Sequence, residues 1–237
     1  TGIPKDFGGS GDPSPYTAHG VLMGIKATAQ KKLGSDNLKG MRIAVQGLGN
    51  VGSHLVKYLS LEGAKVVVAD IDQDRVKIHV DQYKIEAVSP DDILFQDCEI
   101  LAPCALGAII NDQTIGKLKC KAVAGGANNQ LAEARHGDQL KELGILYAPD
   151  YVVNSGGLMN VFVELEGYSG DRAFEKTRKV YDNVMKVFTI AERDSIGTHR
   201  AADRLAEERI ATIGRLKQRH QGKSSRSFTT MREVHNR

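Results

Sequence analysis

A glycine-rich turn between two short apolar runs places the strongest restriction on the fold of this chain. The run Ile43–Val45 leads into Gly47, apolar residues then recur at helical spacing, and the run Val66–Ala69 ends at Asp70. A strand, a helix and a strand within about 30 residues have the size of a βαβ unit. Further short apolar runs follow at Glu99–Ala102, Ala122–Ala124 and Ile145–Tyr147. This pattern predicts an α/β fold with a doubly wound, mostly parallel sheet covered by helices.

The remaining periodic segments predict helices. Their ranges are Pro15–Leu33, Gln130–Leu143, Gly170–Asp194 and Thr198–Arg219. Ser14 before Pro15 is typical of a helix N-cap followed by proline in the first turn. No strand is expected after Tyr151. We therefore divide the chain into a loop and helix (1–34), a sheet domain (35–150), C-terminal helices (151–219) and a basic tail (220–237).

The turn itself reads Gly47-Leu48-Gly49-Asn50-Val51-Gly52, followed by Ser53. A GxGxxG pattern alone is weak, but here it follows a predicted strand and opens a predicted helix. In a Rossmann-type fold, Gly47 permits the tight turn, Gly49 lets the backbone approach a pyrophosphate, and Gly52 permits close packing. The helix N-terminus supplies free N–H groups to the phosphates. The alternative is a glycine turn with no ligand.

Asp70 comes at the end of the second predicted strand, where a carboxylate can accept hydrogen bonds from the adenosine ribose. The same carboxylate repels a 2′-phosphate, so the position favours NAD over NADP. Arg75 is the nearest arginine and leaves the NADP alternative open. A solvated aspartate without a ligand is the other interpretation.

Small residues and amides follow three later strands. The segments are Ala102–Gly107, Gly125–Gln130 and Asn154–Gly157. The carboxyl ends of parallel strands meet at one edge of the sheet, where open α/β sheets bind ligands. These segments suit contacts with a nicotinamide ribose and carboxamide, although each could equally be a helix cap or a turn.

Longer matches extend this interpretation, because residues 1 to about 216 resemble the cofactor-binding part of the Glu/Leu/Phe/Val dehydrogenases. The matching stretches are Pro13–Ala18, Val45–Val51, Ala102–Gly107, Ile109–Ile115, Tyr147–Tyr151 and Ala201–Ile210. The resemblance is strongest to the members that act on leucine. It implies oxidative deamination of L-leucine and other branched-chain amino acids to 2-oxo acids and ammonium, with NAD accepting the hydride.

By position in the family, Thr17 would hold the nicotinamide carboxamide, Asn128 or Asn129 would lie near the nicotinamide ribose, and Asn154 would lie near nicotinamide and substrate. The expected cofactor-binding residues are therefore Thr17, Gly47, Leu48, Gly49, Asn50, Val51, Gly52, Ser53, Asp70, Cys104, Ala105, Asn128, Asn129 and Asn154. Gly52 stands where these enzymes commonly have alanine, a difference that we expect to be harmless. Gly197 and the pair His199-Arg200 also depart from the family pattern.

The family's catalytic lysine follows a glycine-rich segment and acts with an aspartate, both on an N-terminal substrate domain. No Gly-Gly-Lys occurs in these 237 residues, which begin with Thr1 rather than Met, so we expect a fragment or trimmed product. We assign no catalytic residue to this chain and expect it to bind NAD without turnover. The helix 15–33 and the last two helices would form the hinge, and the full-length enzyme would be a homo-oligomer.

Composition and cysteine spacing argue against several classes of partner and site. The net charge of +3 is too small to imply a nucleic-acid partner, and no apolar run is long enough for a membrane span. Cys98, Cys104 and Cys120 have neither disulfide-framework nor zinc-site spacing, so we expect a reducing cytoplasm and no metal.

Four alternatives stay open. Cys104 could be a nucleophile, although a small buried thiol is the simpler interpretation. The substrate could be valine or phenylalanine. The chain could be an NAD-binding regulatory module without chemistry. The basic tail 220–237 could bind RNA or an anionic surface, although a solvated, mobile tail is the simpler expectation.

Overall fold

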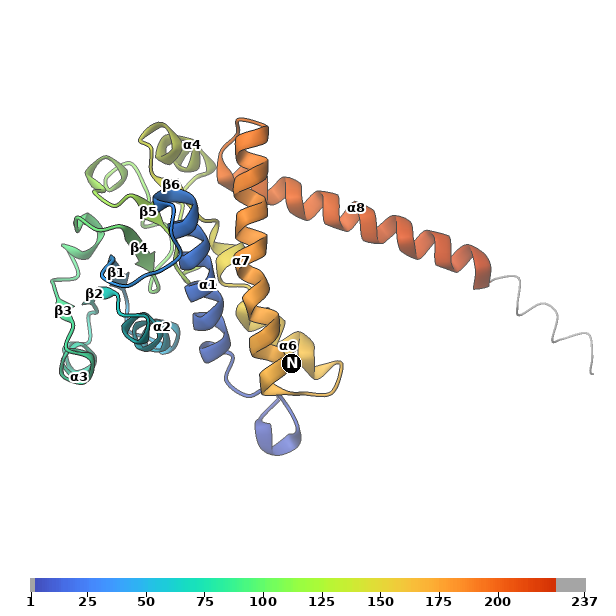
Figure 1. Ribbon diagram of the computed structural model, residues 1–237, viewed down its shortest axis with the longest axis horizontal. Coiled ribbons are helices and arrows are strands. Elements are labelled where there is room, and N and C mark those ends of the chain that lie inside the picture. The colour runs from blue at the N-terminus through green and yellow to red at the C-terminus, as the bar shows by residue number, and fades with distance from the viewer. Residues whose placement is uncertain (1–2, 225–237) are drawn as a thin grey trace, which may run out of the picture.

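The computed structural model describes residues 3–224 and confirms the expected α/β fold (Figure 1). Six strands form one sheet in the order β3-β2-β1-β4-β5-β6, and every neighbouring pair is parallel. The strands are β1 (Arg42–Gln46), β2 (Lys65–Ala69), β3 (Glu86–Ala87), β4 (Ile100–Pro103), β5 (Ala122–Val123) and β6 (Leu146–Tyr147). This is the doubly wound Rossmann-type order, which reverses between β1 and β4.

Eight α-helices lie among the described residues. They are α1 (Ser14–Leu33), α2 (Asn50–Leu61), α3 (Gln73–Tyr83), α4 (Ala134–Glu142), α5 (Asp150–Val153), α6 (Gly156–Glu164), α7 (Gly170–Arg193) and α8 (Thr198–Ser224). Short 3-10 helices cover Lys5–Phe7, Ile93–Phe95 and Ile115–Lys117. The described helix α8 runs five residues past the expected end at Arg219. Residues 220–224, which were predicted to belong to the basic tail, are therefore helical, and residues 225–237 lie outside the described part of the chain.

Alternate residues of the strands face two separate cores. Ile43 and Val45 belong to a core shared with α1, α2 and α7, whereas Ala44 belongs to a second core on the other face. The second core contains Leu140 of α4 and the buried thiols of Cys98 and Cys120. Because both faces are covered, the central residues of β1, β2 and β4 are apolar, which is the pattern that the sequence showed.

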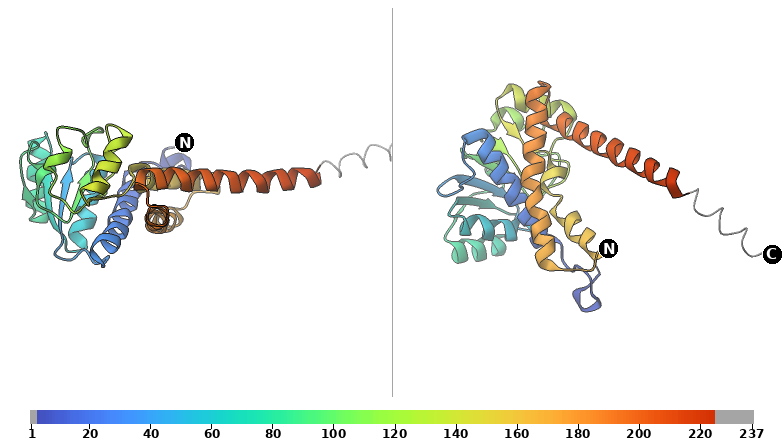
Figure 2. Two further views of the ribbon diagram at one scale, coloured as in Figure 1. Left: turned by 90° about the horizontal axis from the view of Figure 1, so that it is seen from above. Right: turned by 45° about the vertical axis from the view of Figure 1, so that its right-hand side comes forward.

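The C-terminal helices form a layer beside the sheet domain. Helix α7 packs along α1 (Figures 1 and 2), and α8 then leaves the body of the molecule as a long arm. Ile210 on this arm is 71% exposed. The N-terminal segment lies beside α6, since the backbone N–H groups of Ile3 and Ser10 donate to the Glu164 carboxylate.

Several predicted boundaries were wrong. Helix α1 begins at Ser14 with Pro13 at the N-cap, and Ser14 donates both its N–H and its O–H to the Asp12 carboxylate instead of capping the helix. Helix α4 begins at Ala134, not at Gln130, because the buried Gln130 side chain donates to backbone carbonyls of the preceding loop.

Helices α3, α5 and α6 and strand β3 were not predicted. Helix α3 buries only Val76, so it lacks an apolar stripe. Helix α6 begins with two glycines and is apolar on nearly all sides, so it shows neither a start signal nor a helical period. Strand β3 has only two residues, both exposed.

Candidate functional site

The turn after β1 requires a glycine at its first position. Gly47 has φ +94°, and its N–H donates to the Ala69 carbonyl at 2.8 Å. A Cβ at Gly47 would lie only 2.7 Å from the Cβ of Ala105, which belongs to the loop after β4. Gly47 therefore lets the loops after β1 and β4 meet at the place where the strand order reverses. Doubly wound sheets bind their ligands in this crevice.

The start of α2 faces open space. Gly49 is the N-cap, and a Cβ built on it would find no atom within 4 Å. The first turn has no side-chain cap and no acidic residue, and Asn50 is exposed. Free N–H groups and the positive end of the helix dipole therefore face this space, an arrangement suited to an anionic group such as a phosphate.

Gly52 and Ser53 hold the turn in shape. A Cβ at Gly52 would lie 2.0 Å from the Gly47 carbonyl oxygen. Glycine fits this backbone, whereas an alanine at Gly52 would force the turn to shift. The Ser53 hydroxyl donates to the Leu48 carbonyl at 2.7 Å.

Asp70 is fixed against the same turn. One carboxylate oxygen accepts the N–H of Leu48 at 2.5 Å, and the other accepts the N–H of Asp72 at 2.9 Å. Each carboxylate oxygen has two lone pairs, so acceptor capacity is left for a hydroxyl group. Arg75, which had left an NADP site open, forms an ion pair with Asp72 at 2.9 Å.

Two of the three asparagines expected near the nicotinamide are brought together. The Asn154 side chain donates from Nδ2 to Oδ1 of Asn128 at 2.6 Å. Asn129 instead has φ +51°, and it lines a separate cavity of about 240 Å³ beside Tyr151. The sequence left Asn128 and Asn129 as equals, whereas the structure joins Asn128 alone to Asn154.

Thr17 on α1 lies beside the start of α6. A Cβ at Gly157 would lie 2.5 Å from the Thr17 hydroxyl oxygen, and this hydroxyl donates to the Pro13 carbonyl at 3.0 Å. Gly126 fits between α1 and α2, since a Cβ there would lie 3.2 Å from Val21 and 3.1 Å from Val51. These close approaches bring α1, α2 and the loops after β5 and α5 to one edge of the sheet.

Cys104 is a positioned thiol in the loop after β4. Its backbone N–H donates to the Gln46 carbonyl at 2.7 Å. Burial raises the pKa of the Cys104 thiol to about 11, which leaves very little thiolate at neutral pH. The environment favours the structural interpretation over a nucleophile.

The fourteen expected residues thus lie on α1, in the first turn of α2, directly after α5, or where β1, β2, β4 and β5 end at the carboxyl edge of the sheet. Sequence reasoning missed the contact of Gly157 with Thr17 and the Leu48–Asp70 hydrogen bond. The paired glycines after Asn154 and Ser155 were a signal for the first, but no local pattern indicates the second. Within the described residues no cluster of three or more His, Cys, Asp or Glu side chains could hold a metal, and no helix there is long and apolar enough to cross a membrane.

Comparison with known proteins identifies relatives. A profile of the family described as glutamate/leucine/phenylalanine/valine dehydrogenase matches residues 8–76 and 68–217. A leucine dehydrogenase of Geobacillus stearothermophilus is 56% identical over 213 residues, which are 90% of this chain and 58% of that protein. The chain therefore spans less than two thirds of this relative.

Solved structures agree in fold. The crystal structure of L-tryptophan dehydrogenase from Nostoc punctiforme matches with a TM-score of 0.83 and 42% identity, over 86% of this chain and 61% of that one. A hetero-hexameric glutamate dehydrogenase from Thermus thermophilus matches with a TM-score of 0.73 and 26% identity, over 92% of this chain and 56% of that one. The resemblance drawn from the sequence is confirmed.

Proposed function

Because the chain belongs to the glutamate/leucine/phenylalanine/valine dehydrogenase family, we propose that it is the cofactor-binding part of an NAD-dependent amino-acid dehydrogenase. The observation that carries this proposal is the joint arrangement of Gly49 and Asp70. Open space at Gly49 lies before an uncapped helix, and the Asp70 carboxylate is fixed against the same turn. A dinucleotide needs both a phosphate cradle and a ribose acceptor at this spacing.

Each group has a distinct role in this proposal. Backbone N–H groups from Gly49 to Gly52 bind the pyrophosphate, and Asp70 accepts the adenosine ribose hydroxyls. NAD, when bound, accepts the hydride from the substrate carbon. Asn128 lies near the nicotinamide ribose, Asn154 lies near the nicotinamide and the substrate, and Thr17 holds the carboxamide.

The choice of NAD over NADP follows from charge. A 2′-phosphate would lie against the Asp70 carboxylate, and the nearest arginine, Arg75, is held by Asp72. Repulsion between a carboxylate and a phosphate in contact costs several kcal/mol when it is uncompensated. NADPH should therefore bind more weakly than NADH.

The proposed substrate is L-leucine or another branched-chain amino acid. The 56% identity to a leucine dehydrogenase, against 42% to a tryptophan dehydrogenase, supports this choice. Valine and phenylalanine remain the competing substrates, because one or two methylenes change discrimination by only about 1–3 kcal/mol.

These 237 residues supply cofactor binding and not the proton chemistry. No lysine in them lies in the Gly-Gly-Lys context that the family resemblance calls for. We propose that a substrate domain supplies that lysine, that α1, α7 and α8 form the hinge to it, and that the complete enzyme is a homo-oligomer.

Two assays test this function. The purified chain, mixed with NAD and L-leucine, should produce no NADH, measured by absorbance at 340 nm. Detectable leucine oxidation would refute the proposal that a separate substrate domain supplies the catalytic lysine. The chain should restore activity when it replaces the matching part of the Geobacillus leucine dehydrogenase. A folded, NADH-binding chimera that is inactive on leucine, valine and phenylalanine would instead favour a regulatory module.

A further inference from the structure

The loop after β5 carries Asn128, and one buried side chain closes this loop on itself. Gln130 is fully buried, and its Nε2 donates to the Gly125 carbonyl at 2.9 Å and to the Ala127 carbonyl at 3.0 Å. Asn128 lies between Ala127 and Gln130 in the chain and is exposed. The Gln130 amide therefore fixes the backbone on the N-terminal side of Asn128 from a position two residues after it.

The two carbonyls determine which side chain can close the loop. A backbone carbonyl only accepts hydrogen bonds, so the side chain at position 130 must present two N–H donors. The NH2 group of glutamine does this without a charge. An ionised glutamate has no donor to offer, and an asparagine is shorter by one carbon. If both donors are lost, two buried carbonyls lose their partner and the loop is driven toward another path.

The backbone of Gln130 also connects this loop to α5. Its N–H donates to the Asp150 carboxylate at 3.3 Å, and Asp150 is the first residue of α5. Asn154 follows the last residue of this short helix, and its N–H donates to the Asp150 carbonyl at 2.8 Å. Two hydrogen bonds thus join the loop to the segment around α5, one between the Asn128 and Asn154 side chains and one from the Gln130 backbone.

The loop after β4 supports the same loop from another side. The Ala108 N–H donates to the Asn129 carbonyl at 2.6 Å, and the Ile110 N–H donates to the Gln130 carbonyl at 3.0 Å. Ala108 and Asn129 both have a positive φ, +54° and +51°. Residues other than glycine keep this conformation only where their surroundings impose it. The loop 125–130 is therefore held in one defined shape by contacts on several sides.

We propose that Gln130 is a positioning residue for the nicotinamide end of the cofactor. Its buried side chain holds the loop 125–130 so that the Asn128 side chain meets Asn154. This inference rests on the proposed function, in which Asn128 lies near the nicotinamide ribose. A residue that only stabilised the fold would affect the whole dinucleotide, whereas a positioning residue that acts through Asn128 affects the nicotinamide half alone.

The test compares NADH with ADP-ribose, which lacks nicotinamide, by titration calorimetry of the 237-residue chain. Gln130→Met removes both donors and keeps a side chain of similar length. It should weaken NADH at least three-fold, about as much as Asn128→Ala, and change ADP-ribose affinity less than two-fold. Thr28→Val is the matched control, because the fully buried Thr28 hydroxyl also donates to a backbone carbonyl, that of Gly24 within α1. It should change neither affinity.

A double variant distinguishes positioning from a general loosening of the fold. If Gln130 acts through Asn128, then Gln130→Met in the Asn128→Ala background should weaken NADH by less than a further two-fold. Losses that multiply in the double variant would show that the two side chains act independently, and this result would overturn the proposal.

A second single variant keeps the proposal testable if Gln130→Met does not fold. Asp150→Ala removes the acceptor of the Gln130 N–H and leaves the buried amide in place. It should weaken NADH at least three-fold and ADP-ribose less than two-fold, with an unchanged circular dichroism spectrum.

Two results have different consequences for the two proposals. Equal losses of NADH and ADP-ribose in the folded variants, or no loss of either, would overturn the positioning role of Gln130 and leave the dinucleotide site standing. A folded wild-type chain that binds neither ligand would overturn the proposed function, and this inference with it.

Discussion

The backbone N–H of Leu48 donates a 2.5 Å hydrogen bond to the Asp70 carboxylate, which joins the turn after β1 to the end of β2. The same carboxylate also receives the N–H of Asp72. One side chain thus sets the position of the turn and presents its remaining lone pairs beside it. The account predicts that cofactor affinity and cofactor choice both depend on Asp70.

Asp70→Asn tests that dependence. The amide oxygen can still accept one N–H, but the negative charge is lost. Hydrogen bonds to charged groups contribute about 1.5–3 kcal/mol, so NADH affinity should fall roughly 10- to 100-fold. The preference for NADH over NADPH should shrink as well. Asp72→Asn is the control, because Asp72 pairs with Arg75 and caps α3; an equal effect in both variants would contradict the assignment.

Substitutions at two glycines of the turn should have different effects, one on NADH affinity and the other on folding stability. Gly49→Ala meets no atom in the protein and has an ordinary φ, so the chain should keep its Tm and lose most of its NADH affinity. Gly47→Ala must adopt φ +94° and press on Ala105, which should cost about 1–3 kcal/mol of folding free energy. Differential scanning calorimetry and an NADH titration of both variants check this. Unchanged NADH binding in a folded Gly49→Ala chain would exclude the phosphate cradle.

Asn128 and Asn129 should differ although they are neighbours. Asn128 contacts Asn154, whereas Asn129 lines a different cavity. Asn128→Ala should weaken NADH several-fold and leave ADP-ribose, which has no nicotinamide, unchanged. Asn129→Ala should change neither. If the effects are reversed, the nicotinamide end lies on the other side of this loop.

The half-buried His19 predicts a loss of stability in mild acid. Burial, with Arg178 and Lys26 nearby, lowers the pKa of His19 below its usual value, and its Nδ1 lies 2.6 Å from the Thr177 hydroxyl. A histidine whose pKa is lower in the folded state than in the unfolded state favours folding while it is neutral, that is, above its unfolded-state pKa of about 6.5. This contribution to stability is lost as the pH falls below that pKa, because the unfolded state then takes up the proton more readily. The Tm should therefore drop between pH 7 and pH 5. His19→Gln should reduce the drop, whereas His79→Gln on α3 should leave the full slope.

The low reactivity of Cys104 is a further expectation. Burial raises its pKa to about 11, so alkylation by iodoacetamide at pH 7.5 should be far slower than that of a free cysteine. Cys104→Ser should retain NADH binding. Rapid alkylation at neutral pH, followed by mass spectrometry of the Cys104 peptide, would restore the nucleophile interpretation.

The parallel sheet and the glycine turn could be predicted because their signals are local. The run Ile43–Val45, the turn glycines and Asp70 each have one simple structural solution, and the structure follows it. Helix α6 could not be predicted, because an apolar segment that begins with two glycines has no distinct period. The Leu48–Asp70 contact joins residues 22 positions apart, so only the paired strands bring it about.

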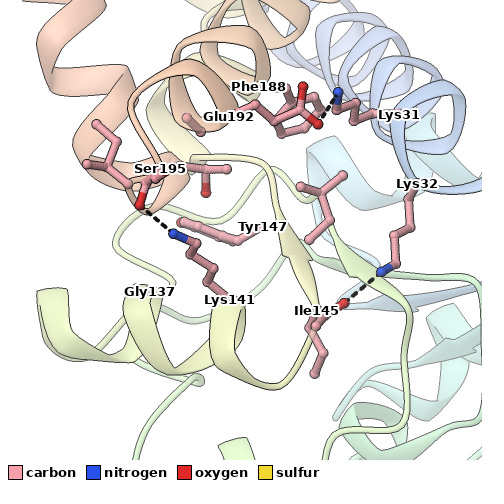
Figure 3. A pocket seen from close by; sticks show the side chains of 14 residues that line it. Lys31, Lys32, Gly137, Lys141, Ile145, Tyr147, Phe188, Glu192 and Ser195 are labelled. Carbon is pink, nitrogen blue, oxygen red and sulfur yellow. Dashed lines mark hydrogen bonds and ion pairs between the residues drawn. The ribbon is translucent and has the colours of Figure 1, made fainter.

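A pocket of about 400 Å³ was outside the reach of sequence reasoning for the same reason (Figure 3). Its lining comes from the end of α1, from α4 and β6, and from the end of α7. Lys32 and Lys141, which both line it, each look in the sequence like a lysine in the last turn of a helix. Only the assembled fold brings these segments to one pocket.

The central claim is that the turn Gly47–Gly52 and Asp70 bind NAD, and one titration tests it most directly. NADH and NADPH are added separately to the purified chain while nicotinamide fluorescence and Tm are followed, and circular dichroism on the same sample reports folding. The account predicts enhanced fluorescence and a higher Tm with NADH, and at least ten-fold weaker binding of NADPH. A folded chain that binds neither cofactor, or that binds NADPH as tightly as NADH, would contradict it.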